Sequence, residues 1–221
     1  MVYRTSQKTL ERKEARRKRL LTEATRIFGR KGFHATTVPM IVAAAESSTG
    51  TFYLYFRTKE DVFAAALESL SQRIALAINE AMAAAGPDVL SHMKAAMRAL
   101  VHFLAEHPEE ARILIVESSG LGKRLESVRR QVIQSHTRSV EQALSALSSR
   151  LPPMDPTVAA SCWVGAAYEA VCRWLEQSPN VRITPEHLAN AITTFNLRAI
   201  GAPESFITQR TDQDRGIGER Q

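Results

Sequence analysis

Apolar side chains recur every three or four positions along most of the chain, which is the spacing of amphipathic helices. The first such stripe comprises Leu20, Leu21, Ala24, Ile27 and Phe28. Gly32 follows this stripe, at the point where a helix C-terminal cap belongs. No stretch shows the sustained alternation of a half-buried strand, so the pattern predicts an all-α fold.

Cap and breaker residues mark the helices that follow. Thr37 is suited to cap a second helix with Pro39 in its first turn. Residues Thr58-Lys59-Glu60-Asp61 resemble a capping box, and the long helix that they open is expected to end near Ala85. The later helices are expected over residues 87–107, 108–116, 121–147, 156–177 and 185–201. From residue 202 onward the chain is polar and is expected to be mobile.

Positive charge is concentrated in the first quarter of the 221-residue chain. Residues 1–60 hold 13 Lys or Arg against 5 Asp or Glu, a net of +8. The remainder holds 16 against 18, a net of −2. This asymmetry fits either a solvated tail or an electrostatic footprint for a polyanion, with nucleic acid the leading candidate.

Several compartments and chemistries are disfavoured. The longest run without Asp, Glu, Lys or Arg is the 14-residue stretch from Gly32 to Ala45, which is too short for a transmembrane helix. The basic N-terminus has no apolar block behind it, which argues against a secretory signal. Cys162 and Cys172 lie ten apart on one predicted helix, about 15 Å of rise, too far to form a disulfide. We therefore expect a cytoplasmic protein with reduced thiols.

Residues 47–56, SSTGTFYLYF, combine small hydroxyl and glycine positions with four aromatics. They follow a short predicted helix and a four-residue break at 45–48, which is the layout of a helix-turn-helix motif. Small residues at the start of the second helix allow close approach to the DNA major groove, and hydroxyls can meet base edges or phosphates. A buried helical hairpin is the alternative, and the polar stretch Thr49-Gly50-Thr51 argues against it.

The stretch from Phe28 to Phe63, FGRKGFHATTVPMIVAAAESSTGTFYLYFRTKEDVF, resembles the DNA-binding domain of the TetR (tetracycline-repressor) family of bacterial regulators. The shared elements are Gly32-Phe33, Ala35 to Val38, Gly50 to Tyr53, Tyr55-Phe56 and Lys59-Glu60. Beyond about 50 residues around them, the chain resembles the family only in length and helix count.

The resemblance implies a three-helix helix-turn-helix domain with a basic arm over residues 1–57. It further implies a larger helical ligand-binding and dimerisation domain over 58–201, about nine helices in all, and a flexible tail over 202–221. The implied DNA contacts are Thr36, Thr37, Ser47, Ser48, Thr49, Gly50, Thr51, Tyr53, Tyr55 and Lys59. Among them Thr49 and its neighbours would face the major groove, the tyrosines would brace the DNA backbone, and Lys59 would reach a phosphate. The arm would be formed by Arg4, Lys8, Arg12 and Arg16.

Two residues depart from the family pattern. The family usually has glycine in the turn, where this chain has Glu46, and an apolar residue next, where it has Ser47. A left-handed conformation at Glu46 would cost about 1 kcal/mol. Because a carboxylate opposes DNA phosphates, we expect that of Glu46 to turn away toward a nearby Arg or Lys.

The last two predicted helices suggest a homodimer. Helix 156–177 is rich in small residues and apolar around most of its circumference. A monomer would therefore leave part of its apolar surface exposed to solvent. A four-helix bundle of 156–177, 185–201 and their symmetry mates would cover that surface, and the resemblance implies this dimer. A monomer core is the alternative. Two linked helix-turn-helix units predict a palindromic operator on double-stranded DNA.

In the family, the region equivalent to residues 61–150 holds a small-molecule effector. Candidate wall residues are Met93, Met97, Phe103, Trp163 and Tyr168, and candidate polar groups are Glu117 and His136. Each is also compatible with an ordinary core position, because methionines and aromatics at helical spacing usually pack the interior.

The two other functional classes are an enzyme and a DNA-binding protein without a small-molecule ligand. An enzyme is disfavoured because the sequence shows no histidine pair at metal-binding spacing, phosphate loop or nucleophile elbow, so no cofactor or metal is expected. A helix-turn-helix protein without a small-molecule ligand remains open. The preferred interpretation is a dimeric regulator, a repressor released from DNA by a small apolar molecule, with no membrane partner.

Overall fold

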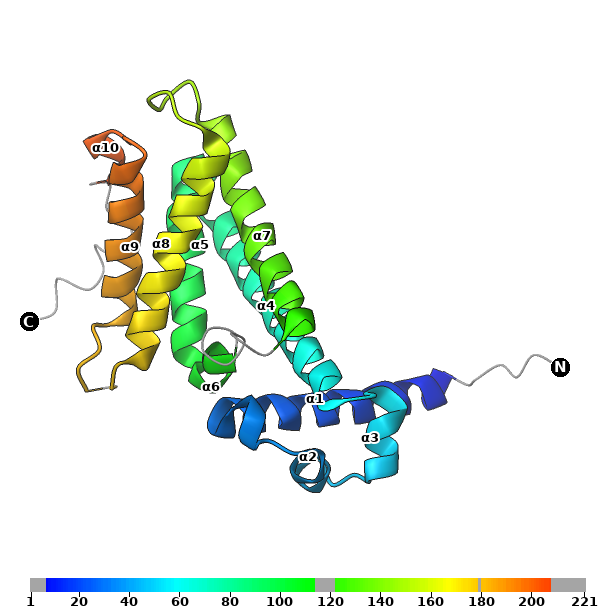
Figure 1. Ribbon diagram of the computed structural model, residues 1–221. Coiled ribbons are helices and arrows are strands. Elements are labelled where there is room, and N and C mark those ends of the chain that lie inside the picture. The colour runs from blue at the N-terminus through cyan, green and yellow to red at the C-terminus, as the bar shows by residue number, and fades with distance from the viewer. Residues whose placement is uncertain (1–6, 114–121, 179, 208–221) are drawn as a thin grey trace, which may run out of the picture. The chain divides into compact units, whose positions relative to one another are not determined.

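A computed structural model describes residues 7–113, 122–178 and 180–207 of the chain (Figure 1). Its helices are α1 (Gln7–Ala35), α2 (Val38–Ala44), α3 (Thr49–Tyr55), α4 (Lys59–Ala84), α5 (Val89–Glu106), α6 (Pro108–Arg112), α7 (Lys123–Ala146), α8 (Pro156–Glu176), α9 (Pro185–Ala199) and α10 (Glu204–Ile207). No strand occurs in these ranges, and the predicted all-α fold is confirmed. Within them, no helix combines the length and apolar character needed to cross a membrane.

Side-chain caps fix the starts of α4, α8 and α9. Thr58 and Asp61 cap each other at the start of α4: the Asp61 amide donates to Thr58 Oγ1 at 3.1 Å, and the Thr58 amide donates to Asp61 Oδ2 at 3.1 Å. Asp155 Oδ1 accepts from two amides at the start of α8. Thr184 Oγ1 accepts from the His187 amide at the start of α9. These reciprocal and single caps satisfy amides that would otherwise lack partners, which confirms the predicted starts of three helices.

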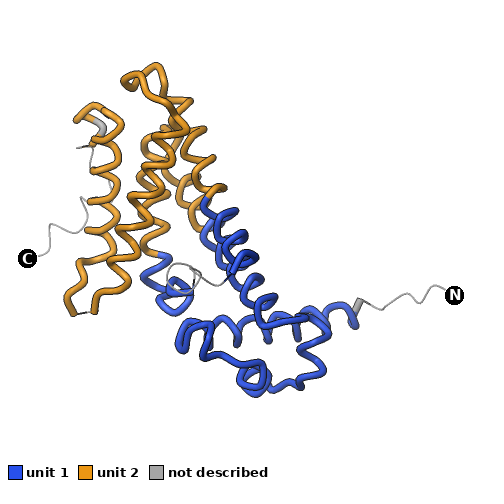
Figure 2. Tube along the Cα trace, in the orientation of Figure 1, with its two compact units in different colours: residues 1–76, 103–133 blue, residues 77–102, 134–221 orange. Residues whose placement is uncertain are grey.

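The chain divides into two compact units (Figure 2). Unit 1 consists of residues 1–76 and 103–133, and unit 2 of residues 77–102 and 134–221. This division by contacts does not test the predicted domain limits of 57 and 201, which stay predictions.

Aromatic rings form the centre of unit 1. The ring of Phe63 on α4 packs edge-on against Phe28 at 4.9 Å and against Phe33 at 5.1 Å between centroids. Phe52 on α3 belongs to the same buried cluster, as does Leu20. Edge-to-face rings add specific geometry to apolar burial, and the helix-turn-helix shares this core with α1 and α4.

Helix α6 is fastened directly to α1 within unit 1. A Cβ at Gly29 would lie only 2.3 Å from the carbonyl oxygen of Glu109, so the two backbones are in contact. Arg30 Nε donates to Glu109 Oε1 at 2.5 Å, and Arg73 of α4 pairs with Glu110. Glycine at position 29 is thus required by a close approach rather than by a turn.

Unit 2 has a separate core between α5, α7, α8 and α9. Trp163 and Leu197 are buried in it. Asn196 is also buried, and its Nδ2 donates to the carbonyl oxygen of Trp163 at 3.3 Å. The segment after α9 differs from the mobile tail that its polarity predicts, because Ala202 is buried and residues 204–207 form α10. Residues 208–221 of that tail lie outside the described ranges.

Candidate nucleic-acid interface

Helices α2 and α3 form the predicted helix-turn-helix. Thr37 caps α2 by accepting from the Met40 amide at 3.5 Å, with proline in the first turn as expected. Ser48 caps α3: its Oγ accepts from the Thr51 amide at 3.1 Å and lies 2.9 Å from Thr51 Oγ1. Both caps use small hydroxyls, so the start of each helix is fixed without a bulky side chain above it.

The turn between these helices is built on Glu46. Its φ of 48° is the positive value predicted for this position, and among the described residues no other non-glycine backbone has a positive φ. The carboxylate turns to Arg19 on α1, with Oε2 2.6 Å from Nη2. Both parts of the prediction for Glu46 are thus confirmed.

One side of α3 is open to solvent. Thr49 and Gly50 at its start are exposed, and Tyr53 one turn later is 53% exposed. Leu54 is 80% exposed, although it is apolar and lies on a helix packed at the domain core. A branched apolar side chain on such a surface is suited to contact a thymine methyl group. Sequence reasoning missed Leu54, although its position two residues after buried Phe52 is the signal for an outward-facing side chain.

The remaining predicted positions support this surface. Tyr55 is half-buried and packs on the core of unit 1. Thr51 and Ser47 are half-buried, while Ser48 and Thr37 are exposed. Helix α1 also contacts the motif, because the guanidinium carbon of Arg17 lies 5.6 Å from the centroid of the Phe56 ring.

The structure corrects the predicted role of Thr36. Its side chain has no exposed surface, and its Oγ1 donates to the carbonyl oxygen of Gly32 at 2.7 Å. A hydroxyl inside the domain cannot reach a phosphate, so the prediction that Thr36 contacts DNA through its side chain is wrong. Its role is structural: it holds the chain where the backbone leaves the α1 helix at Gly32, with φ of 81°.

Lys59 is engaged inside the domain. Its Nζ donates to the carbonyl oxygens of Phe33 at 2.8 Å and Thr36 at 2.9 Å. It also lies 4.2 Å from the centroid of the Phe33 ring. The ammonium therefore ties the start of α4 to the end of α1, and a phosphate contact at this position must compete with these bonds.

The residues predicted for an effector site are distributed over both units. Phe103 belongs to unit 1, where it stacks on His107 at 4.3 Å between ring centroids and lies under the Arg73 guanidinium. Within unit 2, Met93, Met97 and Trp163 are buried, whereas Tyr168 and His136 are half-buried. Glu117 lies outside the described residues, as does Arg4 of the predicted arm.

A shallow hollow in unit 2 contains none of these residues. It has a volume of about 290 Å³ and is lined by Leu144, Ser145, Ser148, Leu151, Pro152, Pro153, Met154 and Pro156.

Burial lowers the pKa of His136 below its ordinary value of 6.5, so the neutral imidazole is favoured in α7. No group of three potential metal ligands occurs in the described parts of the chain.

Comparisons with known proteins agree with this geometry. Residues 20–66 match the family "Bacterial regulatory proteins, tetR family". The chain is 30% identical over 155 residues to the HTH-type transcriptional regulator YdgC of Bacillus subtilis (strain 168), covering 67% of this chain and 75% of that protein. It is 22% identical over 192 residues to the regulator YhgD of the same organism, covering 85% and 97%.

The fold has solved counterparts as well. The transcriptional regulator FadR from Bacillus subtilis, in complex with stearoyl-CoA, superposes with a TM-score of 0.73 at 19% identity, covering 83% of this chain and 98% of that one. Proteins of this kind are named as transcriptional regulators, and the exposed α3 is the element through which a helix-turn-helix reads DNA. The chain belongs to the TetR family and is a DNA-binding transcriptional regulator.

Proposed function

We propose that the protein is a homodimeric repressor of the bacterial cytoplasm, which binds a palindromic operator through α3 and is released from it by a small apolar molecule. The observation that carries this proposal is the surface of α3. Exposed Thr49, Gly50, Tyr53 and Leu54 stand on a helix whose other side is anchored by the fully buried Phe52. Small polar and apolar groups on a rigid support are what direct reading of base edges requires.

The proposed residues divide into those that read bases, those that contact the DNA backbone and one that holds the motif together. We propose Thr49, with Ser48 and Gly50, for the major groove, and Thr37, Tyr53 and Tyr55 for the DNA backbone. Lys59 supports binding to every sequence alike, because its bonds to the carbonyl oxygens of Phe33 and Thr36 hold α4 against the end of α1.

Selection from a randomised duplex library with the full-length protein tests this division. Thr49→Ala should change the preferred sequence at one position of each half-site, whereas Lys59→Ala should weaken binding to all selected duplexes in the same ratio. Thr22→Ala, which removes an exposed threonine from α1, serves as the control and should change neither. Failure to enrich any duplex would contradict the proposed function, and identical changes in both variants would contradict the division of roles.

The proposed dimer uses a surface of unit 2 that a single chain leaves uncovered. Val158, Cys162 and Gly165 are exposed on α8 at spacings of four and three residues. Ala191 and Phe195 are exposed on α9, and the Phe195 side chain is 63% exposed. Small residues that permit close helix approach, beside a large exposed ring, favour a buried helix-helix interface.

The proposed effector is apolar because the predicted wall residues are. FadR of Bacillus subtilis, which shares the fold, is described in complex with stearoyl-CoA, so this thioester is a suitable first probe. Stearoyl-CoA should release the protein from a selected duplex, and free coenzyme A should not. Equal release by both molecules would place recognition in the coenzyme and not in the acyl chain, and release by neither would exclude stearoyl-CoA as the effector.

A further inference from the structure

The carboxylate of Glu186 joins the first turn of α9 to α5 within unit 2. Its Oε2 accepts from Arg98 Nε at 2.9 Å and lies 3.0 Å from His102 Nε2, and both of these partners are on α5. Its Oε1 accepts from Asn190 Nδ2, one turn further along α9, at 3.1 Å. Both carboxylate oxygens are therefore engaged, and these four side chains are called the Glu186 network.

The network is half-buried and charged. The side chains of Arg98 and Glu186 are 33% and 34% exposed. Burial opposes ionisation, but the hydrogen bonds from His102 and Arg98 hold the pKa of Glu186 below its ordinary value of 4.5. Bonds from a guanidinium to a carboxylate are stronger and stricter in geometry than bonds between neutral groups. The network therefore fixes where the first turn of α9 lies against α5.

Other contacts hold the same end of α9 to α8. Trp174 Nε1 on α8 donates to the carbonyl oxygen of Ile183, just before α9, at 2.8 Å. Thr184 Oγ1 accepts from the His187 amide and so caps the helix. The start of α9 is thus positioned by two helices, by α8 through the connecting segment and by α5 through Glu186.

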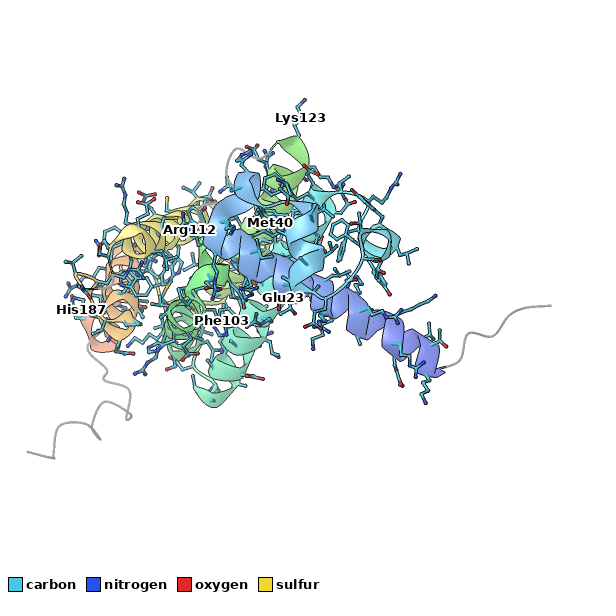
Figure 3. The ribbon with its side chains drawn as sticks, turned by 90° about the horizontal axis from the view of Figure 1, so that it is seen from below. Glu23, Met40, Phe103, Arg112, Lys123 and His187 are labelled. Carbon is cyan, nitrogen blue, oxygen red and sulfur yellow. The ribbon has the colours of Figure 1, made fainter. Side chains whose placement is uncertain are left out.

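The exposed face of α9 lies directly beside the network. His187 follows Glu186 in the chain and lies on the outer side of α9 (Figure 3). Ala191 and Phe195 continue this exposed face at four-residue spacing, and they belong to the proposed dimer interface. Successive residues are about 100° apart around a helix. A rotation of the first turn of α9 against α5 would therefore turn the proposed dimer face as well.

Helix α5 carries candidate wall residues of the effector site. Met93 and Met97 are buried on it, and Met97 directly precedes Arg98. Arg98 and His102 belong to the same continuous helix as these methionines. Because a helix moves as a rigid element over so short a distance, a displacement of α5 at Met97 is passed on to the carboxylate of Glu186.

We propose that the Glu186 network links the effector site to the dimer interface, by positioning the dimer face of α9 according to the position of α5. The proposal rests on the proposed function, which supplies the dimer and the effector, and it adds the residues through which the two sites communicate. Such a linkage is reciprocal: a change in α5 alters the strength of the dimer, and dimerisation alters the affinity of the effector site.

The dimer dissociation constant of the full-length protein tests the role of Glu186. Glu186→Gln keeps the size of the side chain but turns an amide donor toward donors, so sedimentation over a dilution series should show a dimer weakened by about tenfold. Glu80→Gln, the same change at an exposed position of α4 in unit 2, is the control and should leave the constant unchanged. An unchanged constant in Glu186→Gln would overturn the proposal.

A milder variant keeps the test decisive if Glu186→Gln loses its helical circular dichroism. His102→Gln removes one of the two α5 partners and leaves the carboxylate bonded to Arg98 and Asn190. It should weaken the dimer in the same direction at an unchanged helical content. Equal dimer constants in His102→Gln and the wild type would overturn the proposal as well.

A double-mutant cycle tests the linkage to α5 without any ligand. Met97→Ala shortens a buried side chain of α5 and should weaken the dimer of the wild type, but should have little further effect in the Glu186→Gln background. Effects that simply multiply in the double variant would show that Met97 and Glu186 act independently, which would overturn the proposed linkage. A wild-type protein that is monomeric at micromolar concentration would instead contradict the proposed function, so the two failures are distinguishable.

Discussion

At the scale of single residues, Glu46 combines two opposing effects in the turn of the helix-turn-helix. Its left-handed backbone is strained, and its carboxylate adds negative charge next to the DNA-reading helix while occupying Arg19. The exposed ion pair between Glu46 and Arg19 offsets little of the backbone strain, because pairs of this kind stabilise a protein by about 0–1 kcal/mol. Glycine would relieve the backbone and free the guanidinium together.

We predict that Glu46→Gly binds DNA more tightly, by about fivefold for roughly 1 kcal/mol of regained attraction to phosphate, at nearly unchanged stability. Fluorescence anisotropy on a selected duplex measures the affinity. Glu46→Ala is the matched control, because it frees Arg19 equally but keeps the left-handed strain. A large loss of affinity in Glu46→Gly would show that the turn assignment fails.

We expect the free energy of unfolding to depend on pH through His136. Burial depresses its pKa below 6.5, so below that pH the unfolded chain takes up a proton more readily than the folded chain. The stabilisation is complete above the ordinary pKa and is lost as the pH falls through the lowered value. We predict that the free energy of unfolding in urea decreases from about pH 7.5 to about pH 5.5, and decreases less in His136→Gln. An equal decrease in both proteins would assign the effect to other groups.

At the scale of elements, the contact of α6 with α1 leaves no room for a side chain at position 29. A methyl group at position 29 would meet backbone atoms of Glu109, which cannot move aside as a side chain can. We predict that Gly29→Ala destabilises the protein by about 1–3 kcal/mol, against the gain in helix propensity that alanine normally brings. Chemical denaturation measures this, with Lys31→Ala, exposed on the same helix, as the control. A stabilised Gly29→Ala variant would contradict the close approach of α1 and α6.

At the scale of the whole molecule, the two DNA-reading helices of a dimer must be held on one duplex. We predict that Phe195→Asp produces monomers at micromolar concentration, because two like charges would be buried at the proposed interface. Its affinity for a palindromic duplex should fall at least about a hundredfold, because the second half-site no longer benefits from linkage. Analytical ultracentrifugation gives the mass, and Val181→Asp, at another exposed apolar position, is the control. A dimeric Phe195→Asp protein would exclude this interface.

The amino-acid sequence by itself determined the features that depend on near neighbours. Caps such as Thr37, Ser48 and the Thr58–Asp61 pair connect residues three apart, so their hydrogen bonds follow from local spacing. The layout of the helix-turn-helix was predictable for the same reason, whereas the positive φ at Glu46 was predicted from the resemblance to the TetR family. Apolar periodicity likewise determined the helical fold.

Only the tertiary structure decided what depends on residues far apart in the chain. Lys59 finds its carbonyl partners 23 and 26 residues away, and Gly29 meets Glu109 on another helix. Those contacts show why Thr36 is inside the domain and why α6 is fixed to α1, which no local pattern indicates. The packing of whole helices decides whether a polar side chain faces solvent or lies buried between helices. Burial is a property of the assembled core and not of the residue.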